Sequence, residues 1–298
     1  MKKIFIIFIA LVFYSTSVVA VEKFKFKYHI DDSLSKKWVT EFENTMNILQ
    51  EVLPIQDNMY DYLNTPEMPI YAWKNTNKNP FPKIKKNLKG SCICGDGTTL
   101  WMQINIQKQD ITKKRNRVYS VIVHEYFHIY QIALSKNSRS LSDYNPKWLV
   151  EGGAKVLQEI YARQYYGKNF LKSDIQDRER WSIKKVSKEP HLYEKHKTSP
   201  SKKGFDSNYT GSAFMVLALV NELKKNNISE EEAFRLVFRE YWIQRAKYSQ
   251  SETAWRPVFK DTFGMSHDEF YERLSKYKRG RLKKILPSKA LKIQDIFS

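Results

Sequence analysis

The residues best suited to chemistry are His124 and His128, which lie four positions apart in the segment HEYFH. Positions four apart share one face of a helix, so both imidazoles can bind the same metal ion. Glu125 projects about a third of a turn away, where it can take a proton from water on the metal rather than bind the metal itself. Only six histidines occur in the chain. The spacing therefore favours a metal site over the alternative of two core histidines.

A catalytic zinc ion takes three protein ligands and keeps one open position. Glu151, in the segment WLVEGGA, is the candidate third ligand, because a short connection would return its helix antiparallel to the first. Gly152 and Gly153 are poor helix formers, and they suit close helix approach by removing side-chain bulk beside the metal. Taken alone, Glu151 would be an ordinary acidic residue in the first turn of a helix. The preceding HEYFH segment favours the ligand interpretation.

The segments HEYFHIYQ and PKWLVEGGA resemble those of the gluzincin metallopeptidases, which include thermolysin-like enzymes, bacterial collagenases and many small bacterial peptidases. The resemblance spans roughly residues 110–280. It implies that His124, His128 and Glu151 bind one zinc ion per chain and that Glu125 activates water. It also implies a peptide or protein substrate.

The stretch YTGSAF, which begins at Tyr209, is similar to a stretch that opens a later helix in many gluzincins. The resemblance implies that the Tyr209 hydroxyl stabilises the oxyanion that forms during peptide hydrolysis. A phenol donor aimed at developing charge is the kind of group this chemistry needs. The alternative is a packed aromatic side chain, one of 18 tyrosines.

Several departures limit the resemblance. Gln131 and Leu134 occupy the positions where metzincins need glycine and histidine, which excludes that branch. Lys155 stands where thermolysin-like enzymes have an acidic residue that orients a zinc histidine, so no partner for the imidazoles is identified. The Gly-x-Met-Glu-Asn motif of the aminopeptidase N-like group is absent, which favours an endopeptidase.

The patterns predict an α+β fold, and the resemblance implies that it is similar to the thermolysin-like catalytic domain. In the N-terminal subdomain, over 21–110, alternating residues predict a strand at 23–30, and two further strands are expected at 68–73 and 98–106. Apolar residues at helical spacing predict one long helix over 34–53. This subdomain is therefore expected to be a small β-sheet with one long helix.

The pattern becomes helical over 111–298, the expected catalytic subdomain. A first helix at 113–134 carries the histidine pair, and a second is expected to start at an Asn145 cap and to end at Gly167. Residues 168–206 are basic and are expected to be irregular. Further helices are expected at 208–225, after a Ser229/Glu232 capping box, and after a Ser266/Glu269 capping box.

Residues 1–20 are predicted to be a cleavable secretory signal. Lys2 and Lys3 precede an apolar run, and small residues follow it. An uncleaved anchor is the alternative. The mature protein is therefore expected to be exported, either to the periplasm or to the medium, with no transmembrane anchor.

The net charge of +19 predicts attraction to anionic surfaces, unless the lysines simply solvate the surface. No nucleic-acid-binding module is recognisable, so no specific nucleic-acid partner is expected. Cys92 and Cys94 are the only cysteines and are expected to be free thiols or a local bridge.

Four histidines remain outside the motif. His29 and His267 are expected to face solvent, and His191 and His196 border the cleft as candidates for a second oxyanion donor. Two rival functions share the same motif: a zinc amidase acting on cell-wall material, and a basic exported binding protein without turnover. Intact Glu125 disfavours the second, because a silent site has no use for its base.

Overall fold

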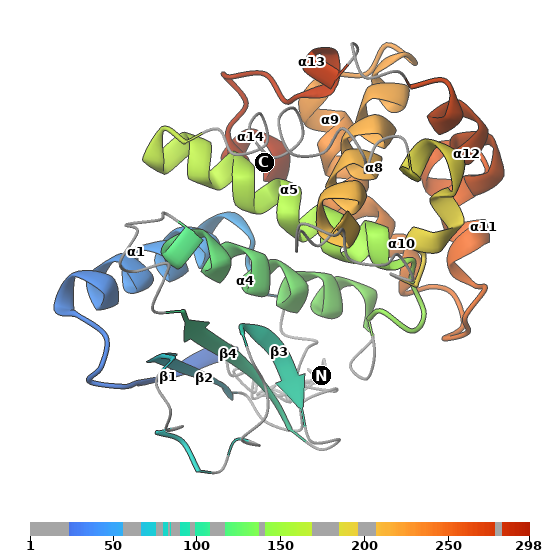
Figure 1. Ribbon diagram of the computed structural model, residues 1–298. Coiled ribbons are helices and arrows are strands. Elements are labelled where there is room, and N and C mark those ends of the chain that lie inside the picture. The colour runs from blue at the N-terminus through green and yellow to red at the C-terminus, as the bar shows by residue number, and fades with distance from the viewer. Residues whose placement is uncertain are drawn as a thin grey trace, which may run out of the picture.

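The computed structural model describes residues 24–55, 67–75, 80–82, 84, 90–95, 99–107, 117–136, 141–168, 185–195, 207–277 and 282–298. The expected signal at 1–20, the subdomain boundary near residue 110 and His196 lie outside these ranges. Within them the chain has an α+β fold, with a small sheet packed under a larger set of helices (Figure 1).

The sheet contains β1 (Lys25–Ile30), β2 (Glu67–Lys74), β3 (Cys92–Gly95) and β4 (Leu100–Ile106) in the order β1-β2-β4-β3. The first three neighbours run parallel, and β3 joins the edge in the antiparallel direction. Three of these strands were predicted. The strand β3 was not, because four residues ending in glycine carry too little alternation to signal a strand.

Cys92 and Cys94 form a disulfide on β3, with their Cα atoms 5.5 Å apart. This is one of the two alternatives left open by the sequence. The bridge lies on the sheet face that also carries Trp73 and Trp101, where the four side chains belong to a small apolar cluster.

Helix α1 (Lys36–Val52) is the predicted long helix, and its apolar stripe is buried. The buried apolar residues of the helix are Trp38, Phe42, Met46 and Leu49, and Leu34 and Leu53 continue the stripe just beyond its ends. Ser35 caps the helix, because its hydroxyl accepts a hydrogen bond from the Trp38 amide at 3.3 Å.

Helices α4 (Arg117–Ser135) and α5 (Lys147–Tyr166) form the centre of the molecule. Figure 1 shows α4 lying between the sheet and α5. Gly167 ends α5 in the left-handed conformation, with φ 64°, as predicted.

The expected Asn145 cap of α5 is wrong. Pro146 occupies the cap position, and no side chain caps this helix. Asn145 is instead buried, where its amide donates to the Leu141 carbonyl and its oxygen accepts from the Tyr241 hydroxyl. The Asn145 side chain therefore makes these buried contacts instead of capping α5 as the local pattern predicted.

The remaining helices cover α5 on the side away from the sheet (Figure 1). They are η3 (Pro190–Tyr193), α8 (Ser207–Lys224), α9 (Glu230–Arg235), the π-helical turn η4 (Leu236–Glu240), α10 (Tyr241–Arg245), α11 (Trp255–Phe263), α12 (His267–Ser275), α13 (Leu282–Ile285) and α14 (Ile293–Phe297). The predicted capping box at Ser266 and Glu269 is present in both directions. At Ser229 the hydroxyl accepts the Glu232 amide.

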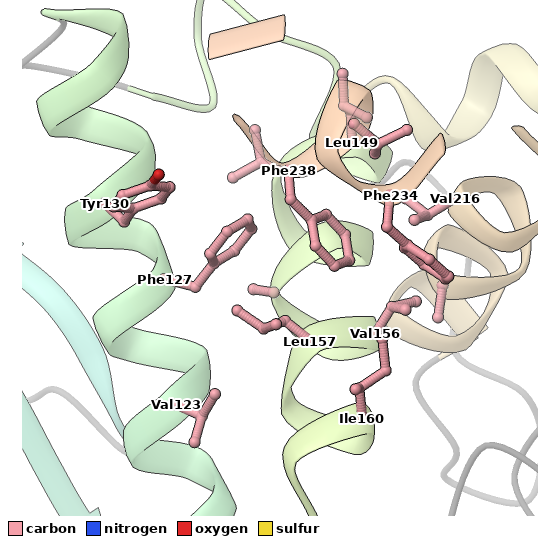
Figure 2. Packing of buried hydrophobic residues seen from close by; sticks show 14 of the residues in the cluster. Val123, Phe127, Tyr130, Leu149, Val156, Leu157, Ile160, Val216, Phe234 and Phe238 are labelled. Atoms are coloured by element: carbon pink, nitrogen blue, oxygen red, sulfur yellow. The ribbon is translucent and has the colours of Figure 1, made fainter. Parts of the chain in front are cut away.

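Apolar side chains pack α4 and α5 against the helices on the side away from the sheet. Phe127 of α4 points between the helices, and its ring lies 5.3 Å from that of Phe238 (Figure 2). Val156 and Leu157 of α5 line the same cluster. Because this layer is close-packed, α4 and α5 have little freedom to move relative to each other. Among the described helices, none is both long and apolar enough to cross a bilayer.

Candidate metal centre

The predicted ligands come together between α4 and α5. His124 Nε2 lies 3.2 Å from Glu151 Oε2, and His128 Nε2 lies 3.4 Å from the same oxygen. The three ligand atoms all lie within 4.8 Å of one another. Both histidines are buried and Glu151 is partly buried. The group can therefore hold a metal ion.

The spacing suits a small tetrahedral ion. Zinc bound at about 2.1 Å separates its ligands by about 3.4 Å when the geometry is tetrahedral. The two distances from Glu151 Oε2, 3.2 and 3.4 Å, match this separation. Two imidazoles and one carboxylate are also a ligand set of catalytic zinc sites.

Antiparallel packing of the two helices explains the convergence. Glu151 faces His124 and His128, and further along α5 the Gln158 amide donates to the Ser120 hydroxyl near the start of α4. Rising residue numbers on one helix therefore meet falling numbers on the other. The sequence predicted this arrangement.

Gly152 and Gly153 permit close helix approach, as predicted. A Cβ atom at Gly152 would overlap the Ser212 backbone carbonyl of α8. A Cβ atom at Gly153 would lie 3.2 Å from the Phe127 ring. The glycines therefore make room for α8 and for the Phe127 ring of α4.

The three ligands form a charge-coupled group. Burial opposes a charge on His128, but the Glu151 carboxylate outweighs burial and raises the pKa of that imidazole. Burial also opposes ionisation of Glu151, and the two histidines outweigh it and hold its pKa well below the ordinary range. Burial lowers the pKa of His124. In the metal-free chain, a proton on His128 therefore balances the charge of Glu151.

Glu125 lies in the same buried region without being a ligand. Burial raises the pKa of its carboxyl to about 8, with the charge of Glu151 acting in the same direction and that of His128 opposing it. The side chain is 5% exposed. A carboxyl whose pKa is close to neutral can both accept and return a proton.

Gln131 supplies the imidazole partner that the sequence did not identify. Its side-chain oxygen lies 2.8 Å from His128 Nδ1, and its amide nitrogen donates to the Val150 carbonyl at 3.2 Å. The spacing of three residues from His128 puts both on neighbouring positions of one helix. That spacing could have been noticed in the sequence, where Gln131 served only to exclude the metzincins.

Tyr209 lies beside the group, as predicted. Its ring centre is 6.2 Å from that of His124, and the side chain is 39% exposed. Tyr209 is therefore exposed to solvent and lies beside the His124 ring.

The other histidines do not join the group in the described structure. His191 is exposed on η3. His29 and His267 were expected to face solvent, and both expectations are wrong in part: His29 stacks on Tyr71 at 4.9 Å, and His267 packs edge-on against Trp255 at 5.0 Å.

Lys155 pairs with Glu159, one turn further along α5. The acidic residue that a thermolysin-like enzyme would have at this position is thus replaced by a cation with its own buried counter-ion. The Lys155 charge also lies close enough to His124 to contribute to the lowered pKa of that imidazole.

Comparison with protein-family models, with curated proteins and with solved structures finds no match. The functional interpretation of the centre therefore depends on its residues and their geometry.

Proposed function

We propose that this protein is an exported zinc metallopeptidase with a thermolysin-like organisation, in which His124, His128 and Glu151 hold one zinc ion. The observation that carries the proposal is the convergence of two imidazole Nε2 atoms on one carboxylate oxygen, at 3.2 and 3.4 Å, beside a buried carboxyl that is not a ligand. A site with only a structural role for its metal would have no use for Glu125.

When bound, zinc supplies Lewis-acid chemistry, acidifying water and polarising a carbonyl. Glu125 accepts the proton of the attacking water and passes it to the leaving amine, which suits a carboxyl with a pKa of about 8. Tyr209 donates a hydrogen bond to the oxyanion from the His124 side. The proposed enzyme is an endopeptidase, which cleaves peptide bonds within the substrate chain.

Metal content tests the proposal. Residues 21–298 would be purified beside a Glu151→Ala variant, exposed to zinc, freed of excess metal and analysed by mass spectrometry. We expect about one zinc ion per chain in the parent protein, from its single three-ligand group, and little in the variant. A parent protein that retains no zinc would overturn the proposal.

Substrate profiling then separates the peptidase from its rivals. A library of internally quenched peptides should be cleaved by the zinc-loaded protein and not after chelation. Cleavage of cell-wall amides in place of peptides would identify the amidase. Zinc binding without hydrolysis in either assay would favour the binding protein.

A further inference from the structure

Gln131 is a fully buried polar side chain that touches both helices of the metal centre. Its oxygen lies 2.8 Å from His128 Nδ1, and its amide nitrogen donates to the Val150 carbonyl at 3.2 Å. Val150 immediately precedes Glu151. One amide group therefore connects one proposed ligand to the backbone beside another.

The orientation of the amide follows from its two partners. The Val150 carbonyl can only accept a hydrogen bond, so the NH₂ group of Gln131 must face it, and the oxygen must face His128. An amide oxygen can also only accept. The Gln131 contact therefore holds a hydrogen on Nδ1, and an imidazole that gives up its Nε2 proton to a metal would present the lone pair on the atom directed at Glu151.

We infer that Gln131 is a positioning residue that sets the His128 tautomer for metal binding and fixes its ring relative to Glu151. The inference rests on the proposed metal site. It assigns to the first ligand helix the orienting role that would be expected of a carboxylate on the second, where the chain instead has Lys155 paired with Glu159. Partners of this kind hold a ligand ring in place and raise its affinity for metal.

The chain offers a matched control in Gln158. This glutamine is also buried, at 5% exposed, and its amide donates to the Ser120 hydroxyl across the same pair of helices at 3.1 Å. It makes no contact with a proposed ligand in the hydrogen bonds of the described residues. Loss of either glutamine removes a buried bond between α4 and α5, but only Gln131 contacts an imidazole.

The experiment compares Gln131→Met, Gln131→Glu and Gln158→Met with the parent protein. Zinc affinity is measured by competition with a chromophoric chelator. We expect Gln131→Met to bind zinc about 10–100-fold more weakly and Gln158→Met to bind it like the parent. Gln131→Glu keeps an oxygen beside Nδ1, so its affinity should lie closer to the parent than to Gln131→Met. Unfolding midpoints measured on the same samples confirm that each variant folds.

Equal zinc affinity in Gln131→Met and the parent would overturn the inference, as would an equal loss in the two methionine variants. ¹H–¹⁵N spectra of the metal-free chain give an independent readout of the hydrogen bond at Nδ1. The parent should show a slowly exchanging proton on His128 Nδ1, and Gln131→Met should lose that protection. A parent whose Nδ1 proton exchanges as fast as that of Gln131→Met would also overturn the inference.

The two proposals fail separately. A parent that binds no zinc refutes the proposed function, whereas the protection of the Nδ1 proton in the metal-free chain still decides the role of Gln131.

Discussion

Two largely buried glutamates, Glu151 in the candidate metal centre and Glu222 near the end of α8, have their charges balanced in different ways. Their side chains are 18% and 3% exposed. Burying a carboxylate is costly unless its charge is balanced and its oxygens accept hydrogen bonds. The two glutamates differ in the groups that surround their carboxylates.

Glu222 is satisfied by permanent partners. The Tyr277 hydroxyl donates to Oε1 at 2.6 Å, Lys225 binds the same oxygen, and an Arg273 nitrogen lies 3.6 Å from Oε2. Burial opposes its ionisation, but the hydrogen bonds from Lys225 and Tyr277 and the nearby cations outweigh burial and lower its pKa. The charge of Glu222 is therefore balanced by side chains of the protein itself.

Among the described residues, the partners of Glu151 are the two imidazoles, and an imidazole is charged only when it holds a proton. In the metal-free centre, a proton on His128 therefore balances the charge of the Glu151 carboxylate. A divalent cation would replace that proton and leave both imidazoles neutral as ligands. The comparison distinguishes an acid with fixed cationic partners from one whose surroundings could hold a metal ion.

The largest expected effect comes from a third buried glutamate, Glu125, which has neither fixed cations nor a ligand role. Replacing it with glutamine removes the proton acceptor but preserves the size of the side chain. Peptide hydrolysis by the zinc-loaded protein should fall by about 10²–10⁴-fold, while zinc content remains at the parent level. Steady-state rates and metal analysis on the same samples provide the check. A variant that hydrolyses peptides at the parent rate would show that Glu125 is not the base.

The next effect is stabilisation by zinc, which should separate the two glutamates. Free zinc at about 100 times its Kd should raise the free energy of unfolding by about 2.7 kcal/mol in the parent and in Glu222→Gln. Glu151→Gln should gain little. Denaturant titrations with zinc and with a chelator measure the difference. Equal zinc stabilisation in all three proteins would mean that the metal binds elsewhere.

Without metal, the two variants should differ by a smaller amount in their free energy of unfolding, and Glu222→Gln should be the less stable of the two. Glu222→Gln loses a network of charged hydrogen bonds, so its free energy of unfolding should fall by about 1 kcal/mol, a value reduced because Lys225 and Arg273 are partly exposed. Glu151→Gln should lose less, because His128 can release its proton when the carboxylate is gone, so that no unpaired charge stays buried. Chelator-treated samples unfolded in urea test this order. A larger loss in Glu151→Gln would make that residue a structural acid like Glu222.

The sequence predicted those features that depend on spacing along one element. The apolar stripe of α1 and the shared helix face of His124 and His128 follow from helical periodicity alone. Glu151 was also predicted, because an antiparallel return of the second helix constrains which residues can face the pair. The structure places these three side chains together.

The features that were missed depend on contacts between distant segments. Asn145 looked like a helix cap but bonds to Tyr241 across 96 residues. His267 looked exposed but packs against Trp255. A local pattern does not contain these partners, so no reading of the neighbouring residues could have found them. Gln131 is the exception, since its relation to His128 is local.

The smallest effect is a pH dependence, which separates charge from hydrogen bonding at Glu222. Its pKa is lower in the folded protein than the ordinary value of 4.5, so the folded state favours the ionised form. The stability that this charge contributes is therefore fully present above pH 4.5 and is lost as the pH falls through the folded-state pKa. The difference in unfolding free energy between the parent and Glu222→Gln should shrink on acidification below that pH.

The measurement is a series of urea titrations of both chains from neutral to acidic pH, in the presence of chelator. The proposed ligands Glu151 and His128 titrate in both chains, so their contribution cancels in the difference. A difference that stays constant down to strongly acidic pH would show that Glu222 acts through neutral hydrogen bonds, such as the one from Tyr277. In that case the contrast with Glu151 would be one of bonding geometry rather than of charge.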